Sequence, residues 1–247
     1  MPRFIIVPAG TFTDPSGFED VGLVPLTFPP SLYLDFDPNV AGSIVKDGSN
    51  NVTKWTNTLG TQALDTPGVA SAYPLWTASD LNGLPSIDIN NGATKALWSS
   101  ADILHNLSLG YSFAAVFNAP VMTSVSIFNS SGIASNVTSA FYSAALTWRN
   151  NGSESLNFGA LPGGTWLIIT GTYNATGNVC KVWNSGTLIN TLNSAGAPTA
   201  SRKLSLGWNT VFNARIKFAR FQFYNTTLSP AEQDVVRDIL AAKYALP

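Results

Sequence analysis

Short runs rich in β-branched and aromatic residues alternate with turn-forming pairs along most of this chain, and this alternation constrains its fold more than any other feature. The pairs contain residues that accept a positive φ in tight turns: Asp47-Gly48, Asn82-Gly83, Asn91-Gly92, Asn151-Gly152, Gly163-Gly164 and Ser185-Gly186. The runs between them predict strands over residues 32–36, 86–89, 96–98, 111–118, 125–128, 141–148, 166–173, 179–183, 204–208 and 216–224. Many short strands at such spacing are typical of an antiparallel β-sandwich.

The last predicted strand alternates regularly. Ala219, Phe221 and Phe223 occupy one set of positions, and Arg220 and Gln222 occupy the other. Successive side chains of a strand point to opposite faces, so this pattern predicts one dry face and one wet face.

One helix is predicted after that strand. Ser229 is placed to cap its N-terminus, Pro230 takes the first helical position, and Glu232 completes a capping box. The apolar residues that recur at helical spacing are Val235, Val236, Ile239, Leu240 and Tyr244. This short C-terminal helix is therefore expected to pack one face on the sandwich.

Residues 1–30 differ from the rest of the chain. They contain six prolines, and a proline has no backbone N–H for a strand ladder or a helix interior. The same stretch is also too apolar for a solvated tail. We predict an extended N-terminal arm over residues 1–30 and one sandwich domain over residues 31–247. The arm either lies on its own domain or docks on a neighbouring subunit or a larger assembly.

Low charge limits the classes of partner. Charged residues make up 11% of the chain, against about 25% in ordinary soluble domains. Thirteen basic and fourteen acidic residues give a net charge of −1, with no basic run. Nucleic acids and anionic membranes attract clustered Lys and Arg, so we expect neither partner. No segment approaches the roughly 20 apolar residues of a membrane helix, and the start of the chain lacks the longer apolar stretch of a signal peptide.

The C-terminal stretch is similar to the closing strand and helix of concanavalin A-like, laminin-G-like jelly rolls. Residues 218–232 resemble the pattern Ile-Ala-Glu-Val-x-Ile-Tyr-Asn-x-x-Leu-Ser-x-x-Glu. Weaker matches follow in the family's order: Trp55 with Asn57 and Gly60, residues 83–89, Asn91-Gly92, residues 166–169 with Tyr173, residues 182–186 with one residue inserted, and Leu206-Gly207. The resemblance covers residues 31–247 and implies two curved antiparallel sheets. Its members range from lectins to glycosidases and parts of viral particles, so it does not fix the function.

Catalysis is hard to build from these residues. Glycoside hydrolysis requires two carboxyl groups across the scissile bond, and the resemblance would place them on one strand. The three glutamates, Glu19, Glu154 and Glu232, are far apart in sequence. Asp35 and Asp37 form a spaced pair in a predicted strand, where we expect a structural or turn role. We therefore predict no enzymatic activity, and we keep a glycan-active hydrolase or lyase as an alternative.

Metal and nucleophile sites are also sparse. His105 is the only histidine and is expected on the surface, and Cys180 is the only cysteine and is expected to be a buried, inert thiol. No zinc-ligand spacing occurs. Asp80, Asp88, Asn90 and Asn91 offer oxygens that could hold Ca²⁺, but turns rich in Asp and Asn explain them equally well. We expect no cofactor, with calcium as the open alternative.

Surface recognition remains. Neutral sugars are bound by aromatic rings flanked by groups that read hydroxyls, and the chain has seven tryptophans. If Cys180 and Val182 point inward, strand alternation turns Lys181 and Trp183 outward. The predicted carbohydrate-binding residues are Trp183, Lys181, Trp148, Asn150, Trp208 and Asn209. A packing role stays open for each tryptophan, and Trp55 and Trp166 are expected in the core.

These observations predict a non-catalytic, lectin-like component of a virion, such as a phage head or tail appendage. It would be made in the host cytoplasm, form a homo-oligomer, contact other virion proteins through residues 1–30 and recognise a host surface glycan. A structural capsid decoration or assembly protein without glycan binding is the alternative.

Overall fold

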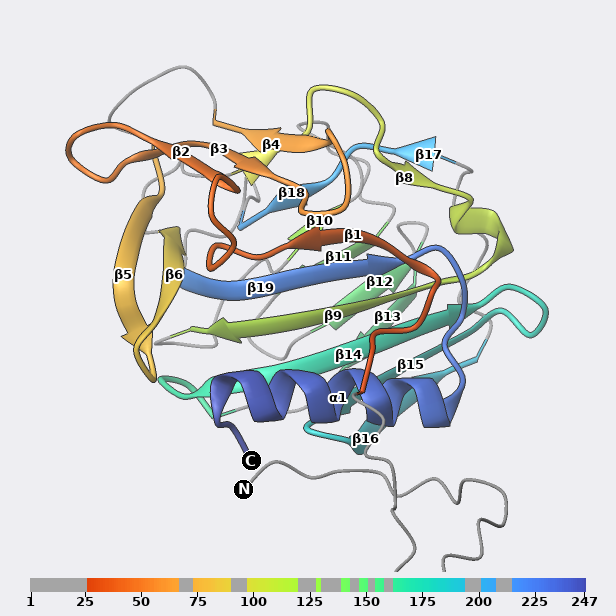
Figure 1. Ribbon diagram of the computed structural model, residues 1–247. Coiled ribbons are helices and arrows are strands. Elements are labelled where there is room, and N and C mark those ends of the chain that lie inside the picture. Colours follow the sequence, from red (N-terminus) through yellow and green to blue (C-terminus); the bar gives the residue numbers. More distant parts are fainter. Residues whose placement is uncertain are drawn as a thin grey trace, which may run out of the picture.

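The computed structural model describes residues 26–66, 73–89, 97–119, 128–129, 139–142, 147–150, 154–157, 162–193, 201–207 and 215–247. Within them the chain forms two antiparallel sheets packed face to face, with an α-helix on the outside of one sheet (Figure 1). The predicted all-β antiparallel sandwich with a short C-terminal helix is therefore confirmed. Residues 1–25, which make up most of the predicted arm, lie outside the described residues.

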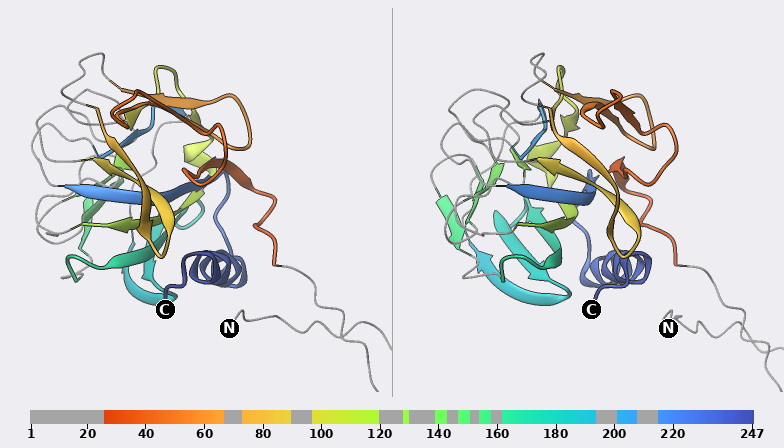
Figure 2. Two further views of the ribbon diagram at one scale, coloured as in Figure 1. Left: turned by 60° about the vertical axis from the view of Figure 1, so that its left-hand side comes forward. Right: turned by 90° about the vertical axis from the view of Figure 1, so that its left-hand side faces the viewer.

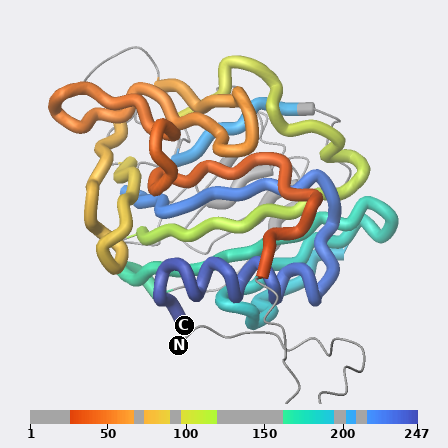
Figure 3. Tube along the Cα trace, viewed as in Figure 1, coloured from red at the N-terminus to blue at the C-terminus, as the bar shows by residue number. Residues whose placement is uncertain are grey.

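The larger strands form an eight-stranded sheet, called sheet A here. Its order is β16 (Thr187–Leu192), β15 (Val179–Asn184), β14 (Trp166–Asn174), β9 (Tyr111–Asn118), β19 (Ile216–Tyr224), β6 (Leu84–Ile89) and β5 (Leu75–Leu81), with β1 (Leu32–Phe36) also paired to β19. β6 pairs with the first residues of β19 and β1 with the last. Figure 3 follows the trace, in which the first and last described strands of the sequence lie side by side. The bounds of β1, β9 and β19 are those that the sequence predicted.

The second sheet, sheet B, has nine short strands. Its order is β13 (Glu154–Asn157), β12 (Thr147–Asn150), β11 (Ser139–Tyr142), β10 (Phe128–Asn129), β18 (Ser205–Leu206), β7 (Leu97–Trp98), β4 (Ala63–Asp65), β3 (Val52–Thr56) and β2 (Ile44–Lys46). A separate pair joins β8 (Leu104–His105) to β17 (Ser201–Arg202), and the 3-10 helix η2 (Leu107–Leu109) follows β8.

One predicted strand was wrong. The sequence indicated a continuous strand over residues 141–148, but β11 and β12 are antiparallel partners, with Tyr142 opposite Thr147 and Phe141 opposite Trp148. The chain therefore reverses between them. An apolar run can belong to one strand or to the two arms of a hairpin, because each arm keeps the same alternation of side chains.

The inner core fills the space between the sheets. Sheet B contributes Trp55, Leu97 and Leu206, and sheet A contributes large residues such as Phe117 and Phe221, all fully buried. The predicted core role of Trp55 is confirmed. Burial of this much apolar side-chain area is the main favourable contribution to folding.

α1 (Pro230–Tyr244) lies against the outer face of sheet A, as the two views of Figure 2 show, and a second apolar cluster joins the two. Val236, Leu240 and Tyr244 form the buried face of the helix. Ser229 accepts a hydrogen bond from the amide of Glu232 and the Glu232 carboxylate accepts one from the amide of Ser229, which confirms the predicted capping box. No helix in the described ranges is long and apolar enough to cross a membrane.

The predicted wet face of β19 was wrong, because Arg220 and Gln222 are both buried. Arg220 donates two hydrogen bonds to the carboxylate of Asp35, at 2.7 and 2.6 Å. Its guanidinium also lies 3.5 Å from the carboxylate of Asp37. A buried charge is tolerated when it is paired and hydrogen-bonded, so polar residues can lie beneath the helix. The expected structural role of Asp35 and Asp37 is confirmed.

Residues 26–30 lie on this domain. Pro29 is buried, and the Phe28 ring packs against the outer cluster. The guanidinium carbon of Arg220 is 4.6 Å from the centroid of that ring. The end of the predicted arm therefore covers the buried arginine.

Candidate functional site

β15 presents two side chains to the outside of sheet A. Cys180 and Val182 are buried in the inner core, at 1% and 0% exposure. Lys181 and Trp183 are on the opposite face, where Lys181 is exposed and Trp183 is half-buried. Strand alternation predicted this orientation, and the buried thiol of Cys180 was predicted with it. Among the described residues, Trp183 is not part of either apolar cluster.

β16 adds an apolar neighbour and a hydroxyl to the same face. Leu188 lies directly opposite Trp183, and Thr191 lies opposite Lys181. Directly opposed residues of an antiparallel pair have Cβ atoms about 5 Å apart. A bulge at Val182 and Trp183 shifts the register, so that Leu188 is left 48% exposed instead of joining the core.

The turn between β15 and β16 brings in the helix. Gly186 has a φ of 82°, and a Cβ there would overlap the Arg237 side chain. The amide of Ser185 donates to the carbonyl oxygen of Ile168 at 2.9 Å and fixes the turn to β14. The glycine thus provides both the left-handed backbone and the space in which α1 places Arg237.

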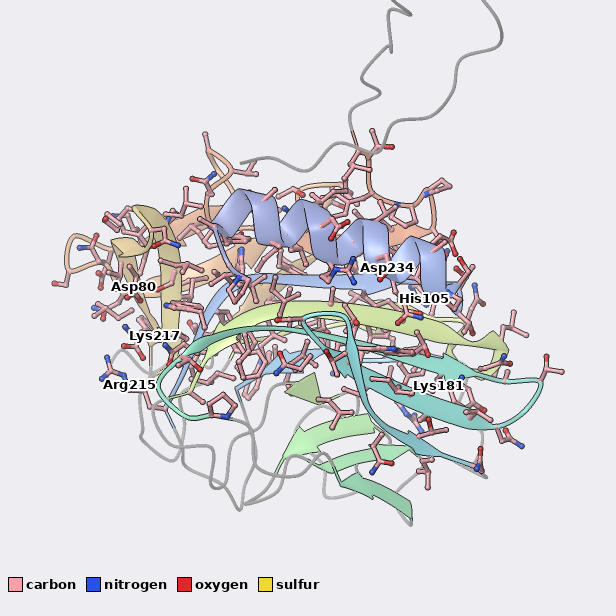
Figure 4. The ribbon with its side chains drawn as sticks, turned by 90° about the horizontal axis from the view of Figure 1, so that it is seen from below. Asp80, His105, Lys181, Arg215, Lys217 and Asp234 are labelled. Atoms are coloured by element: carbon pink, nitrogen blue, oxygen red, sulfur yellow. The ribbon has the colours of Figure 1, made fainter. Side chains whose placement is uncertain are left out.

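Arg237 has a fixed charge at this position. It pairs with Asp234 at 2.6 Å and with Asp238 at 2.9 Å. The hydrogen bond to Asp238 raises the pKa of Arg237, more than burial lowers it. Lys181, Trp183, Leu188, Thr191 and Arg237 together are called the hairpin face. Figure 4 shows Lys181 and Asp234, the partner of Arg237, in the view that looks onto this side of sheet A and the helix.

The hairpin face has the chemistry of a saccharide contact. An indole ring beside an exposed leucine offers an apolar surface for the C–H face of a sugar ring. Lys181 and Arg237 donate hydrogen bonds, and Thr191 donates and accepts. Sites for small polar ligands combine such apolar surfaces with a few placed polar groups.

The other predicted binding residues are not brought to this face by the described structure. Trp148 and Asn150 belong to β12 in sheet B, where Leu156 and Glu154 are their respective partners in β13. Their side chains, like all of Trp208 and Asn209, lie outside the described residues. Their predicted role therefore stays a prediction.

The oxygens considered for calcium have other partners. The Asp80 carboxylate accepts hydrogen bonds from Lys217 at 2.8 and 3.0 Å. The Asp88 carboxylate pairs with Arg215. Asn90 and Asn91 lie outside the described residues. Within the described ranges, no group of three His, Cys, Asp or Glu side chains is placed to hold a metal ion.

His105 is exposed, and its ring meets the ring of Tyr33 edge-on at 5.9 Å. This confirms the predicted surface position of His105. Its neighbours in β8 and β17 form a separate two-stranded sheet, so it is not part of the hairpin face.

Sequence reasoning missed Leu188, Thr191 and Arg237. The Ser185-Gly186 turn predicts a hairpin that places β16 beside β15. Leu188 and Thr191 could therefore have been identified from the sequence. Arg237 carried no such signal, because it joins the face only through the docking of α1 on sheet A.

No family model and no curated protein matches the chain. Among solved structures, the chain is similar to the botulinum neurotoxin serotype G binding domain, with a TM-score of 0.62 at 11% identity over 85% of this chain and 51% of that one. The binding domain of Paraclostridial Mosquitocidal Protein 1 aligns with a TM-score of 0.61 at 12% identity, covering 83% of this chain and 51% of its own. A botulinum neurotoxin type C structure aligns with a TM-score of 0.58 at 15% identity, covering 85% and 51%. The likeness extends to the fold alone.

The chain thus spans about half the length of the structures that it resembles. They share its β-rich architecture at identities that carry no residue-level correspondence.

Proposed function

We propose that this chain is a non-catalytic, lectin-like binding domain that recognises a surface carbohydrate through the hairpin face. The observation that carries the proposal is the pair of Trp183 and Leu188, held side by side on the outside of sheet A with two cationic side chains and a hydroxyl around them. The aromatic and apolar groups would stack on a sugar ring, and the polar rim would hydrogen-bond its hydroxyls.

The similar structures support this class of function. Cell entry of botulinum neurotoxin type C depends on interaction with two ganglioside molecules. A botulinum neurotoxin DC binding domain is solved in complex with SialylT, and another is solved with rat synaptotagmin II. The two neurotoxin DC structures are of a binding domain, on a fold similar to that of this chain.

We further propose that the chain works as part of a virion, in the family of concanavalin A-like jelly rolls. The composition of residues 1–30 supports this, because six prolines within an apolar stretch suit an extended arm that docks on another protein. The alternative is an assembly protein that binds no glycan. The closing strand and capped helix, which match the family pattern and form as predicted, support the family proposal.

A glycan-array screen of the full chain tests the carbohydrate proposal, with Trp183→Ala and Trp183→Phe beside it. We expect one glycan class to bind, Trp183→Ala to lose at least about tenfold in affinity, which corresponds to about 1.4 kcal/mol, and Trp183→Phe to recover part of it. Trp148→Ala, in the other sheet, tests the second predicted tryptophan. A broad array without binding would refute the glycan proposal and favour the assembly alternative.

A further inference from the structure

Two ion pairs lie at the end of sheet A away from the hairpin face. Arg215 donates from Nε to both oxygens of Asp88, at 3.0 and 2.9 Å, and also from Nη2. Lys217 donates to both oxygens of Asp80, and Ser86 donates to Asp80 at 2.6 Å. These five residues are called the Arg215 cluster. Figure 4 shows Arg215, Lys217 and Asp80 at one end of the molecule and Lys181 toward the other.

The cations of this cluster are more exposed than the anions. The Arg215 side chain is 45% exposed over an Asp88 that is 5% exposed, and Lys217 is 22% exposed beside an Asp80 at 17%. Arg215 uses two of its five N–H groups on Asp88, and the other three have no hydrogen-bond acceptor among the described residues. The solvent-facing side of the Arg215 cluster therefore presents the remaining N–H donors of a guanidinium that Asp88 holds in place.

The carboxylate partners also hold the side chains of Arg215 and Lys217 in position. The hydrogen bond to Asp88 raises the pKa of Arg215, more than burial lowers it. Burial acts to raise the pKa of Asp80, but the hydrogen bonds from Lys217 and Ser86 outweigh it and lower that pKa. Donors that are already oriented lose less conformational entropy when a ligand binds.

Trp166 lies on the same face of sheet A as the Arg215 cluster. Direct register partners place Asp88, Lys217, Asn118 and Trp166 in one row across β6, β19, β9 and β14. Directly paired residues share a face of the sheet, and strands are about 4.8 Å apart, so about 10 Å separates the strand of Lys217 from that of Trp166. Trp166 is half-buried and packs against the outer apolar cluster, so its predicted place in the core was wrong: it lies at the margin of that cluster and is partly exposed.

From this arrangement we propose a second ligand site, which takes a sugar that bears a carboxylate. Arg215 and Lys217 bind the carboxylate by charge-assisted hydrogen bonds. Asn118, which lies between Lys217 and Trp166 in the row, forms the base of the site. Trp166 packs against the C–H face of the ring. A divalent cation does not fit, because both carboxylates already pair with basic side chains.

This site is separate from the hairpin face. Trp183 pairs with Thr170, four residues along β14 from Trp166, which corresponds to about 14 Å. The outer apolar cluster and α1 occupy the face between them. The inference therefore does not rest on the glycan proposal, and either can fail without the other.

Titration of the full chain, followed by the ¹H–¹⁵N resonances of its tryptophan indoles, tests the site. Trp166→Phe and Trp183→Phe assign the two reporter resonances. The probes are two matched pairs, methyl glucuronide with methyl glucoside and methyl galacturonide with methyl galactoside, which differ only in the carboxylate. We expect a uronide to shift the Trp166 resonance saturably, and its neutral partner to bind at least about tenfold more weakly.

The variants must avoid leaving a buried carboxylate unpaired. The double variant Arg215→Gln with Asp88→Asn removes both charges and keeps a hydrogen bond, and we expect it to weaken uronide binding at least about tenfold. Lys54→Gln, which breaks an exposed pair with Asp65 at 3.8 Å in sheet B, is the matched control and should bind normally. Added salt should weaken the wild-type interaction.

Three results with the sugar probes would overturn the inference. They are a Trp166 resonance that no uronide shifts, equal binding of the uronide and its neutral partner, and uronide binding that survives in the double variant. Propionate is the remaining probe, because it has a carboxylate and no sugar ring. If propionate shifts Trp166 as strongly as a uronide does, the site reads carboxylates in general and the saccharide assignment is wrong. The Trp183 resonance in the same spectra reports on the hairpin face independently.

Discussion

The pairing of Arg220 with Asp35 is the residue-scale feature that organises the outer layer. This ion pair is inside the protein, and Lys243 of α1 and Arg220 both reach the neighbouring Asp37. Gln222 donates to Asp35 at 3.3 Å and accepts from the hydroxyl of Tyr224 at 3.0 Å. The network ties β1, β19 and the helix together, so the helix docks in one register.

Removing the arginine should therefore be costly. Arg220→Met leaves two buried carboxylates with fewer partners, and we expect it to lower the free energy of unfolding by about 3–5 kcal/mol. Urea unfolding followed by circular dichroism measures this. Lys54→Met, which breaks an exposed pair, should cost less than about 1 kcal/mol. Equal effects of the two substitutions would show that the buried network does not hold the layer.

Two tyrosines beneath the helix make stability depend on alkaline pH. Burial, with the nearby Asp35, raises the pKa of Tyr224, and burial, with Asp37, raises that of Tyr244. Both groups stay protonated in the folded protein, so their contribution is fully present below the unfolded pKa of 10.0 and is lost as pH rises above it. Two such groups give a slope of about −2.7 kcal/mol per pH unit.

The check is urea unfolding at about pH 8 and about pH 11. The double variant Tyr224→Phe with Tyr244→Phe should lose most of this extra alkaline slope, although it also loses the hydroxyl bonds to Gln222 and Ala219. A wild-type protein equally stable at both pH values would contradict the assignment.

For single residues, the sequence predicts the orientation of those side chains that follow strand alternation. The inward Cys180 and the outward Trp183 needed only a strand and its period of two. Arg220 could not be predicted as buried, because its partner Asp35 lies 185 positions away in the chain. Leu188 was missed because a bulge, which leaves no clear signal in the pattern, turns it outward.

The element that builds the candidate site is the β15–β16 hairpin. Its turn has positive φ at Ser185 and at Gly186, and the Arg237 side chain of α1 lies so close to Gly186 that a Cβ there would displace it. The hairpin and the helix therefore touch at this turn, and the hairpin face combines residues of both.

Gly186→Ala tests that contact. The left-handed backbone alone should cost about 1–2 kcal/mol, and overlap with Arg237 adds to it. Thermal unfolding of Gly186→Ala, Arg237→Ala and the double variant separates the two contributions. We expect the double variant to recover the overlap and to keep the backbone cost. A Gly186→Ala protein as stable as wild type would contradict the close approach.

Element prediction succeeded for three long buried strands, and it failed for several short ones, for the seven-residue β5 and for the 141–148 run that forms two strands. β9, β14 and β19 are buried along most of their length, and their eight or nine residues, rich in aromatic and apolar side chains, were enough to predict them. Strands such as β2 and β4 have three residues each, too few to show any period. They form because neighbouring strands of sheet B provide partners, which is tertiary information.

For the whole molecule, the boundary of the arm leads to a prediction. Phe28 and Pro29 pack on the domain, and the Phe28 ring lies over Arg220. A chain that starts at residue 26 should therefore keep the stability of the full chain. A chain that starts at residue 31 should lose about 1–2 kcal/mol, because it exposes the cation and loses the ring above it. Urea unfolding of the two truncations checks this, and equal stability of both would contradict it.

The assembly role of the arm is tested separately. We expect a chain without residues 1–25 to fold and yet to fail to incorporate into the particle that carries the full chain. Incorporation of the truncated chain would refute the proposed docking role.

The measurement that tests the central claim most directly compares two leucine substitutions. Leu188 is 48% exposed on the hairpin face, and Leu109 is 75% exposed at the end of η2 and is not one of the hairpin-face residues. The affinity of each alanine variant for the glycan found on the array would be measured by equilibrium titration. We predict that Leu188→Ala weakens binding about tenfold, through lost apolar contact worth about 1.4 kcal/mol, and that Leu109→Ala binds like wild type. Unchanged binding by Leu188→Ala, or an equal loss in both variants, would contradict the assignment of the hairpin face.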